Sequence, residues 1–183
     1  MNKILFIDTE TGGINPMKNS LLEIGLVVWR EGKITDENLI KIKHDDYTVT
    51  PIAMDINDIN LKEHEKDAVS TEKAIETIMK YKGKHFKDNK AVIGGHNTSF
   101  DTNFIKQLFK ESDYIYGKNF SHREVDTASI LKYLSHKERF NKELKSLNDA
   151  IDYFDLKITK KERHTGIADA LITAKLYNKL LNI

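Results

Sequence analysis

The alternation of hydrophobic and polar positions predicts a β-rich first third of the chain. Apolar runs of strand length occupy residues 3–8 (KILFID) and 21–30 (LLEIGLVVWR). A polar turn at residues 31–33 (EGK) connects the second run to a third, residues 34–43 (ITDENLIKIK). Short apolar runs separated by turn residues are typical of paired strands. The first third is therefore predicted to be a meander of three strands.

The rest of the chain alternates helical patterns with short strands. Beyond a loop around Pro51, apolar residues recur every three or four positions in segments 70–82, 100–111, 144–154 and 165–181. Short strands are predicted at residues 91–95 (AVIGG) and just before Asp126, where a further helix begins. This order predicts an α/β fold with a mixed five-stranded sheet flanked by helices.

Length and composition favour one domain that spans residues 1–183. The chain has no cysteine, which excludes disulfides and thiolate metal sites. The start of the chain is too short and too soon acidic for a signal peptide, and no apolar stretch approaches the roughly 20 residues that span a bilayer. We therefore expect a cytoplasmic protein without a membrane segment.

The net charge of +1 neither requires nor excludes a nucleic-acid partner, because such a partner needs only a local basic surface. Two segments are basic, residues 82–90 (KGKHFKDNK) and 157–164 (KITKKERH). Each segment alone is more typical of a solvated, lysine-rich loop.

Two carboxylates stand at the end of the first predicted strand, in the stretch FIDTETGG. Asp8 and Glu10 are two residues apart, so both side chains point to the same side of the sheet. Burying two neighbouring carboxylates is unfavourable because each loses hydration and the two repel. This pair predicts a bound counter-charge.

Two further acids face inward from the first turns of predicted helices. Asp101 is in line with Phe104 and Ile105, and Asp169 is in line with Ile172 and Leu176. Either acid alone is explained by the preference of helix N-termini for negative charge. Four inward acids together are more simply explained by convergence on divalent cations, and all-oxygen ligands suit Mg²⁺ or Mn²⁺.

His164 lies five residues before Asp169, in the loop that enters the last predicted helix. A neutral imidazole at such a site can act as a general base toward water. Glu23, in the second strand, is interpreted as a cross-strand partner rather than as a fifth acid of the site.

Three motifs in this order resemble the DEDDh-type 3′–5′ exonucleases, a family with the ribonuclease-H-like fold. The motifs are FIDTETGG, GHNTSFDTNFI and HTGIADALITAKLY, and together they span nearly the whole chain. The resemblance implies hydrolysis of a phosphodiester bond at the 3′ end of single-stranded DNA or RNA, which releases a nucleoside 5′-monophosphate. It also implies two Mg²⁺ ions, for which Mn²⁺ can substitute.

The resemblance assigns roles to individual residues. Asp8 would bridge both ions, Glu10 and Asp169 would complete the first ion's site, and Asp101 would help to hold the second. His164 would take the proton from the attacking water. Thr11, Gly12, His96 and Asn97 would contact the terminal nucleotide or support the site. Gly12 stands where many members of the family carry Thr or Ala.

Other interpretations of the same residues remain open. One is a catalytically silent domain of the same fold that binds nucleic acid or a polymerase, although all four acids and His164 are present. Another is a metal-dependent enzyme that acts on a small phosphodiester. Within the exonuclease interpretation, the end of the chain at Ile183 favours a free-standing nuclease. Compact members of the family are often homodimers, and the two basic segments could reach a partner's site.

Overall fold

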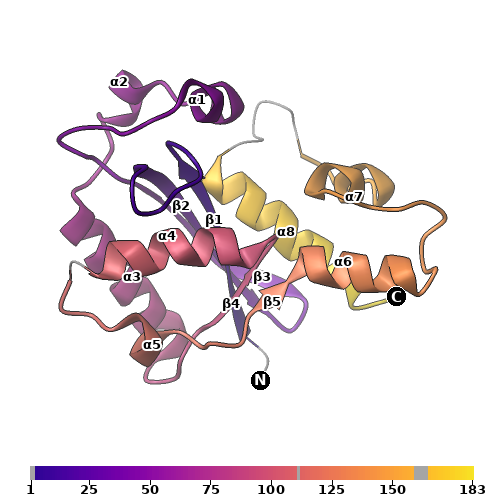
Figure 1. Cartoon of the computed structure of the whole chain (residues 1–183). Helices are drawn as coiled ribbons and strands as arrows, with labels where there is room; N and C mark the ends of the chain where they lie inside the picture. The colour runs from indigo at the N-terminus through magenta and orange to yellow at the C-terminus, as the bar shows by residue number, and fades with distance from the viewer. Residues whose placement is uncertain (1–2, 111, 159–164) are drawn as a thin grey trace.

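The computed structural model describes residues 3–110, 112–158 and 165–183. A five-stranded sheet in the order β3-β2-β1-β4-β5 forms its centre (Figure 1). The strands are β1 (Lys3–Thr11), β2 (Leu21–Arg30), β3 (Lys33–Lys41), β4 (Val92–Gly95) and β5 (Val125–Asp126). Neighbouring strands among β1, β2 and β3 are antiparallel, whereas β4 runs parallel to β1 and β5 runs parallel to β4. The sheet is therefore mixed, as predicted.

The central strand β1 is longer than its sequence pattern suggested. It continues past the predicted end at Asp8 as far as Thr11, because β2 pairs with it along this whole length. Asp8 and Glu10 are thus held inside a paired strand rather than in the loop that follows. Their orientation is fixed by the pleat of the sheet.

Eight helices surround the sheet within the described residues. They are α1 (Pro51–Asn57), α2 (Leu61–His64), α3 (Thr71–Phe86), α4 (Thr98–Lys110), α5 (Tyr116–Asn119), α6 (Thr127–His136), α7 (Leu147–Tyr153) and α8 (Gly166–Leu180). The five predicted helical segments correspond to α3, α4, α6, α7 and α8.

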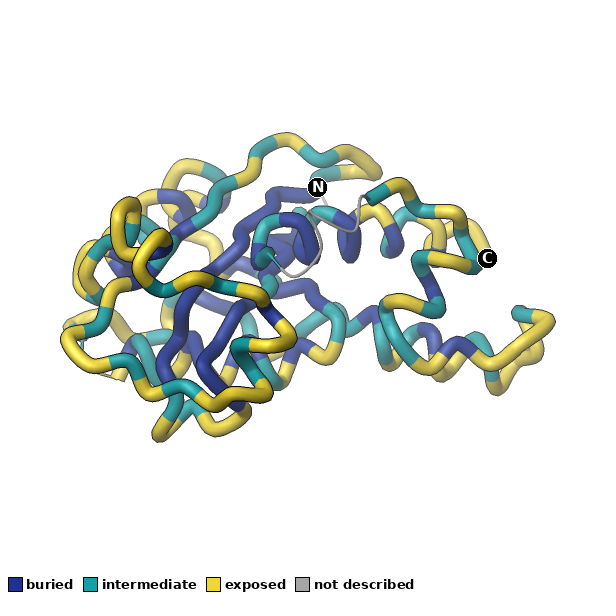
Figure 2. Tube along the Cα trace, turned by 90° about the horizontal axis from the view of Figure 1, so that it is seen from above, coloured by how far each residue is buried: buried dark blue, intermediate teal, exposed yellow. Residues whose placement is uncertain are grey.

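The helices cover both faces of the sheet. Leu5 and Ile7 of β1 point to the face covered by α3 and α4, where they belong to a core cluster with Phe104 and Ile105. Alternate residues of the same strand, Ile4 and Phe6, point to the opposite face and pack with residues of α8. Figure 2 shows the buried strands at the centre of the molecule and exposed residues in the outer loops. A smaller cluster joins α6 and α7 to the C-terminal half of α8.

The segment around Pro51 is a helix, not the loop that we predicted from the proline. Pro51 occupies the first turn of α1, where its missing N–H is not needed, and the side chain of Thr50 accepts a hydrogen bond from Ala53 N. The helix ends at Asp58, which adopts the left-handed conformation with φ of 54°. Seven residues with an exposed apolar side give little periodic signal. The helices α2 and α5 were missed because four residues are too few to show a helical period.

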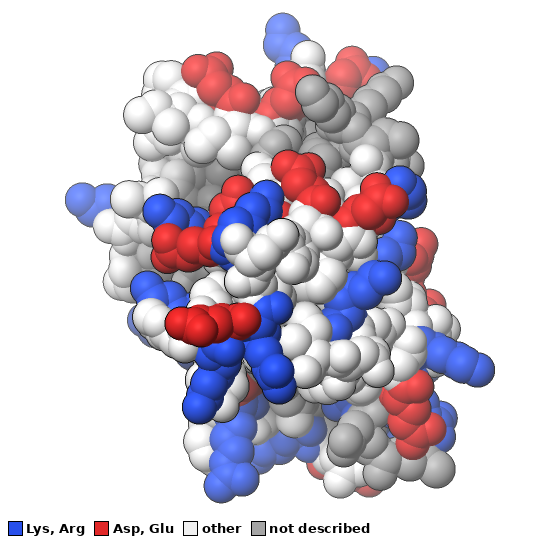
Figure 3. All heavy atoms as spheres, turned by 90° about the vertical axis from the view of Figure 1, so that its right-hand side faces the viewer, with Lys and Arg blue, Asp and Glu red and all other residues white. Residues whose placement is uncertain are grey.

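None of the described helices is both long enough and apolar enough to cross a membrane. On the face shown in Figure 3, basic and acidic side chains are interspersed over the surface, in keeping with the net charge of +1.

Candidate active site

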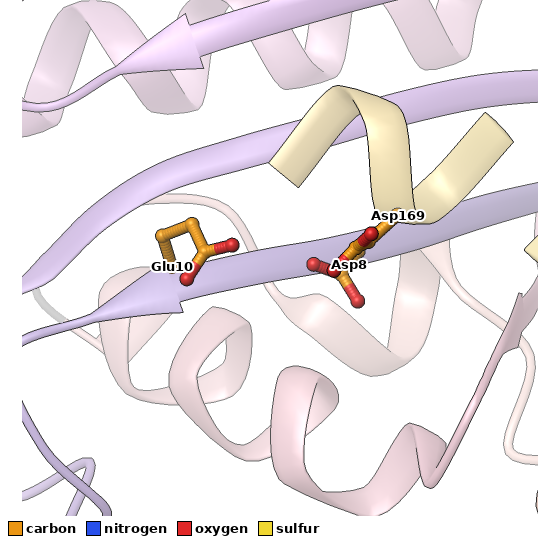
Figure 4. Close-up of side chains that lie close together, drawn as sticks. All are labelled: Asp8, Glu10 and Asp169. Atoms are coloured by element: carbon orange, nitrogen blue, oxygen red, sulfur yellow. The ribbon is translucent and has the colours of Figure 1, made fainter. Parts of the chain in front are cut away.

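Three carboxylates meet where β1 ends and α8 begins. Asp8 and Glu10 point to the face of the sheet that α8 covers, and Asp169 lies in the first turn of α8. Ligand oxygens of all three residues lie within 4.8 Å of one another. Figure 4 shows Asp169 reaching from the helix toward Asp8, with Glu10 farther along the strand. The structure thus brings together three of the four acids that the sequence pattern selected.

This cluster is largely removed from solvent. Glu10 is 9% exposed and Asp169 is 7% exposed, while Asp8 is half-buried. Negative charges held this close repel one another, and burial strengthens the repulsion. Among the described residues, the converging ligand atoms are all oxygens, which is the donor set that hard divalent cations prefer. The residues therefore fit a divalent cation.

The close approach of α8 depends on two glycines. Gly25 of β2 lies directly opposite Asp8 in the strand register. A Cβ atom on Gly25 would lie 2.0 Å from the carbonyl oxygen of Gly166, the first residue of α8. A Cβ atom on Gly166 would in turn lie 3.1 Å from the backbone oxygen of Asp8. Backbone therefore packs on backbone at this point, and this contact places Asp169 beside Asp8.

Asp101 approaches the same end of β1 from the other face of the sheet. Thr9, whose side chain points away from Asp8 and Glu10, donates hydrogen bonds to Asp101 Oδ1 from its backbone nitrogen at 2.9 Å and from Oγ1 at 2.7 Å. Asp101 is 4% exposed and lies outside the group formed by Asp8, Glu10 and Asp169. Its assignment as a metal ligand remains a prediction.

Burial raises the pKa of Asp101 to about 7, and the two hydrogen bonds from Thr9 oppose this rise. In the folded, metal-free protein the pKa of the Asp101 carboxyl therefore lies above the ordinary value of 3.8 that is expected in the unfolded chain. The raised pKa means that the folded protein holds the proton of Asp101 more tightly than the unfolded chain does. The contribution of Asp101 to the free energy of unfolding is therefore fully present below pH 3.8 and is lost as the pH rises through about 7.

Asp101→Asn should therefore raise the melting temperature of the chelator-treated protein at pH 8 and leave it almost unchanged at pH 4. Each kcal/mol regained corresponds to about 2–4 °C in a chain of this size. Thermal unfolding between pH 4 and pH 8 measures the effect, with the exposed Asp113→Asn as the control. A variant that melts below the wild type at pH 8 would show that ionised Asp101 is favourable in the folded state.

His96 and Asn97 follow β4 at the same edge of the sheet. His96 Nδ1 lies 2.9 Å from Thr127 Oγ1, which itself donates to the carbonyl oxygen of Gly95. Asn97 has a φ of 68°, and its backbone N–H donates to Asp126 Oδ1 at 2.7 Å. The side chain of Asn97 is exposed and that of His96 is half-buried, so a contact with substrate remains a prediction for both.

Asp126 caps α6, as its position in the sequence predicted. Its side chain accepts hydrogen bonds from Ala128 N, Asn97 N and Ser129 Oγ. Burial alone would raise the pKa of Asp126, but the hydrogen bonds from Ser129, Asn97 and Ala128 outweigh it and lower the pKa. These bonds account for Asp126 without a ligand role.

Thr11 and Gly12 are buried against the segment that contains α1. The nitrogen of Gly12 donates to Ser20 O at 2.7 Å, and its carbonyl accepts from Thr50 N at 2.6 Å. A Cβ atom on Gly12 would lie 2.4 Å from the carbonyl oxygen of Thr48, so a Thr or Ala side chain has no room here. Thr11 Oγ1 donates to Gly13 O. Contact of either residue with a nucleotide remains a prediction.

Asn57, which the structure places near the acids, was not among the residues predicted from the sequence. Its side-chain amide donates to the carbonyl of Thr11 at 3.2 Å, one residue beyond Glu10. This buried contact joins the end of α1 to the end of β1. Gly25 was also missed, although a glycine inside an otherwise apolar strand is a recognised sign of close backbone approach.

His164 and most of the second basic segment lie outside the described residues. Thr165, which follows His164, is the N-cap of α8, and its side chain accepts a hydrogen bond from Ala168 N. The general-base role of His164 therefore remains a prediction.

The fold and the carboxylate cluster together give a site whose oxygen donors suit divalent cations. A family sequence model described as "Exonuclease" matches residues 5–177. The chain therefore belongs to this exonuclease family, and the predicted enzyme class, a 3′–5′ exonuclease, is confirmed.

Curated relatives agree with this assignment. Ribonuclease T of Yersinia pseudotuberculosis is 26% identical over 185 residues, which cover 96% of this chain and 83% of that protein. The PolC-type DNA polymerase III of Thermotoga petrophila is 24% identical over 180 residues, which cover 97% of this chain but only 12% of the polymerase.

Solved structures with the same fold include E. coli exonuclease I in complex with a dT13 oligonucleotide, with a TM-score of 0.81 and 17% identity. The match covers 98% of this chain and 41% of exonuclease I. Exonuclease I of Methylocaldum szegediense gives a TM-score of 0.83 at 14% identity and covers 100% of this chain and 40% of that one. The present chain thus spans about two fifths of these enzymes, and the predicted ribonuclease-H-like fold is confirmed.

Proposed function

We propose that this chain removes nucleotides one at a time from the 3′ end of single-stranded DNA or RNA and releases nucleoside 5′-monophosphates. The convergence of Asp8, Glu10 and Asp169 at one strand end carries the proposal. Family membership supports it, since relatives include an enzyme named for RNA and an exonuclease solved with a DNA oligonucleotide. Residues 1–183 would act as one nuclease domain.

The acids would hold two divalent cations, Mg²⁺ or in its place Mn²⁺. Asp8, Glu10 and Asp169 are the ligands that the geometry supports, and Asp101 would contribute from the other face of the sheet. When bound, such cations stabilise the charge that develops on the attacking and leaving oxygens. His164 would accept the proton of the attacking water.

The terminal nucleotide would lie at the edge of the sheet where β1 and β4 end. The exposed side chain of Asn97 and the half-buried His96 border this edge. Thr11 and Gly12 would contribute the shape of the strand end, because the hydroxyl and carbonyl of Thr11 and the backbone N–H and carbonyl of Gly12 make hydrogen bonds within the chain. A homodimer in which basic residues serve the partner's site is part of the proposal.

The test is a set of parallel reactions on 5′-labelled single-stranded RNA and DNA of one sequence, with Mg²⁺, with Mn²⁺ and with chelator. We expect a ladder that shortens from the 3′ end and disappears with chelator. His164→Ala should slow the reaction by about 10²–10⁴-fold, the usual contribution of a general base. The exposed His122→Ala is the matched control.

The faster strand identifies the preferred nucleic acid. Absence of a ladder from both strands with both metals would overturn the proposal. The silent binding domain and the enzyme for a small phosphodiester would then be the remaining candidates.

A further inference from the structure

A fifth carboxylate, Glu23, lies beside the site without belonging to the proposed ligands. It is 5% exposed and stands directly opposite Glu10 in the pairing of β1 with β2. Directly opposed residues of antiparallel strands point to the same face, so Glu23 also faces α8. Glu23 thus has a cross-strand neighbour, but this neighbour is Glu10, so Glu23 lies beside the site and not apart from it as the sequence interpretation had it.

The two oxygens of Glu23 face two different elements. Oε2 lies 3.4 Å from the backbone nitrogen of Gly166, which donates to it from the first turn of α8. Oε1 lies 3.8 Å from Nδ1 of His64, at the end of α2. A buried carboxylate is tolerated only where such partners replace water. Glu23 therefore links the start of α8 to the α1–α2 segment across β2.

His64 is held so that it can face Glu23. It is 3% exposed, and its Nε2 lies 3.1 Å from the carbonyl oxygen of Ile42, just beyond β3. Because a carbonyl only accepts hydrogen bonds, Nε2 carries the hydrogen in this contact. Nδ1 is then directed at Glu23 and has no hydrogen-bond partner of ordinary length among the described residues. Because a carboxylate accepts hydrogen bonds and does not donate them, Nδ1 attracts Glu23 only in an imidazole that carries a proton on both nitrogens. The ring of Tyr47 packs edge-on against the imidazole.

We propose that Glu23 is a positioning residue of the active site and that His64 holds it in place. Glu23 fixes the first turn of α8 relative to β2, and so keeps Asp169 at the right distance from Asp8 and Glu10 for metal binding. The role rests on the proposed metal-dependent function. Groups that orient metal ligands without touching the metal typically contribute 10–100-fold to affinity or activity.

The test compares two substitutions of similar size. Glu23→Gln keeps an oxygen for Gly166 N and adds an amide that can donate to His64 Nδ1, whereas Glu23→Met keeps the volume and loses both polar contacts. Binding of Mn²⁺ to the full chain is measured by electron paramagnetic resonance without nucleic acid. Unfolding is followed in parallel by circular dichroism, and the exposed Glu37→Gln on β3 is the control.

We expect the methionine variant to bind Mn²⁺ about 10–100-fold more weakly, and the glutamine variant to stay close to the wild type. His64→Gln should weaken binding in the same direction. A methionine variant that melts earlier but binds Mn²⁺ normally would overturn the proposal, since Glu23 would then serve only stability. Equally weak Mn²⁺ binding by Glu23→Gln and Glu23→Met would also overturn the proposal. The negative charge of Glu23, and not its contacts with Gly166 and His64, would then determine metal binding.

Two further outcomes are distinguished by the design. If Glu23→Met does not fold, Glu23→Asp is measured in its place. The shorter aspartate keeps the negative charge but cannot reach both Gly166 N and His64 Nδ1. Normal Mn²⁺ binding by Glu23→Asp would overturn the proposal. If the wild type binds Mn²⁺ but leaves nucleic acid intact, the proposed function fails while the positioning role of Glu23 is still measured.

Discussion

Asp169→Asn is expected to lower the rate of hydrolysis by a factor of about 10³, which corresponds to about 4 kcal/mol of transition-state stabilisation. Asparagine preserves the shape of the side chain but removes one of the three negative charges that converge at the end of β1. The affinity of oxygen sites for divalent cations depends strongly on the number of charged ligands. The loss should therefore appear both in the rate and in the metal concentration needed for half-maximal activity.

The same substitution reduces repulsion between neighbouring carboxylates in the metal-free protein, so a loss of activity without a comparable fall in melting temperature would point to metal binding and not to folding. Initial rates over a range of Mn²⁺ concentrations and melting temperatures with chelator measure the two effects. Asp152→Asn, an exposed acid on α7, is the control for loss of one negative charge. Wild-type metal dependence in Asp169→Asn would remove this residue from the ligand set.

Gly25→Ala is expected to reduce activity by about 10²-fold although residue 25 carries no chemistry. The added methyl carbon would lie 2.0 Å from Gly166 O and 2.5 Å from Ile167 N, and both atoms belong to the backbone. Ordinary contact requires at least 3.4 Å, so the carbonyl oxygen of Gly166, and α8 with it, must move by about 1.4 Å. A misplacement of this size in a catalytic group can reduce the rate about 10²-fold. Overpacking should also lower the free energy of unfolding by about 1–3 kcal/mol.

Gly83→Ala is the matched control. Gly83 lies inside α3, and an added Cβ atom there meets nothing within 4 Å. Alanine at this position should raise stability by about 1 kcal/mol and leave activity unchanged. If Gly25→Ala retains full activity at temperatures well below its melting point, the contact between Gly25 and Gly166 does not set the position of Asp169.

The parts of the fold that were predictable are those with a strong local pattern. The bounds of β2 agree with its uninterrupted apolar run, and α8 agrees with its stripe of Ile172, Leu176 and Leu180. The helix α1 was missed because Pro51 was interpreted as a loop signal. Proline also suits the first turn of a helix, and only the cap at Thr50 distinguishes the two cases.

The candidate site was predictable where side-chain direction follows from periodicity. Alternation along β1 places Asp8 and Glu10 on one face, and helical spacing turns Asp169 toward the sheet. Periodicity does not say which face of the sheet a helix covers, and this is why the separate approach of Asp101 through Thr9 could not be foreseen. Contacts such as Asn57 with Thr11 join residues 46 positions apart and leave no local signal.

Side-chain size at the interface between α8 and β2 differs between the two ends of the helix. Gly25 meets Gly166 at the start of the helix, whereas at its far end Trp29 and Tyr177 pack edge to face with ring centroids 5.2 Å apart. Backbone lies against backbone at the glycine pair, whereas two aromatic rings lie between the helix and the sheet at the other end. A change in the bulk of Tyr177 is therefore expected to shift α8 against β2, so the spacing of the carboxylates can be altered from about two helical turns beyond Asp169 without changing any residue of the site.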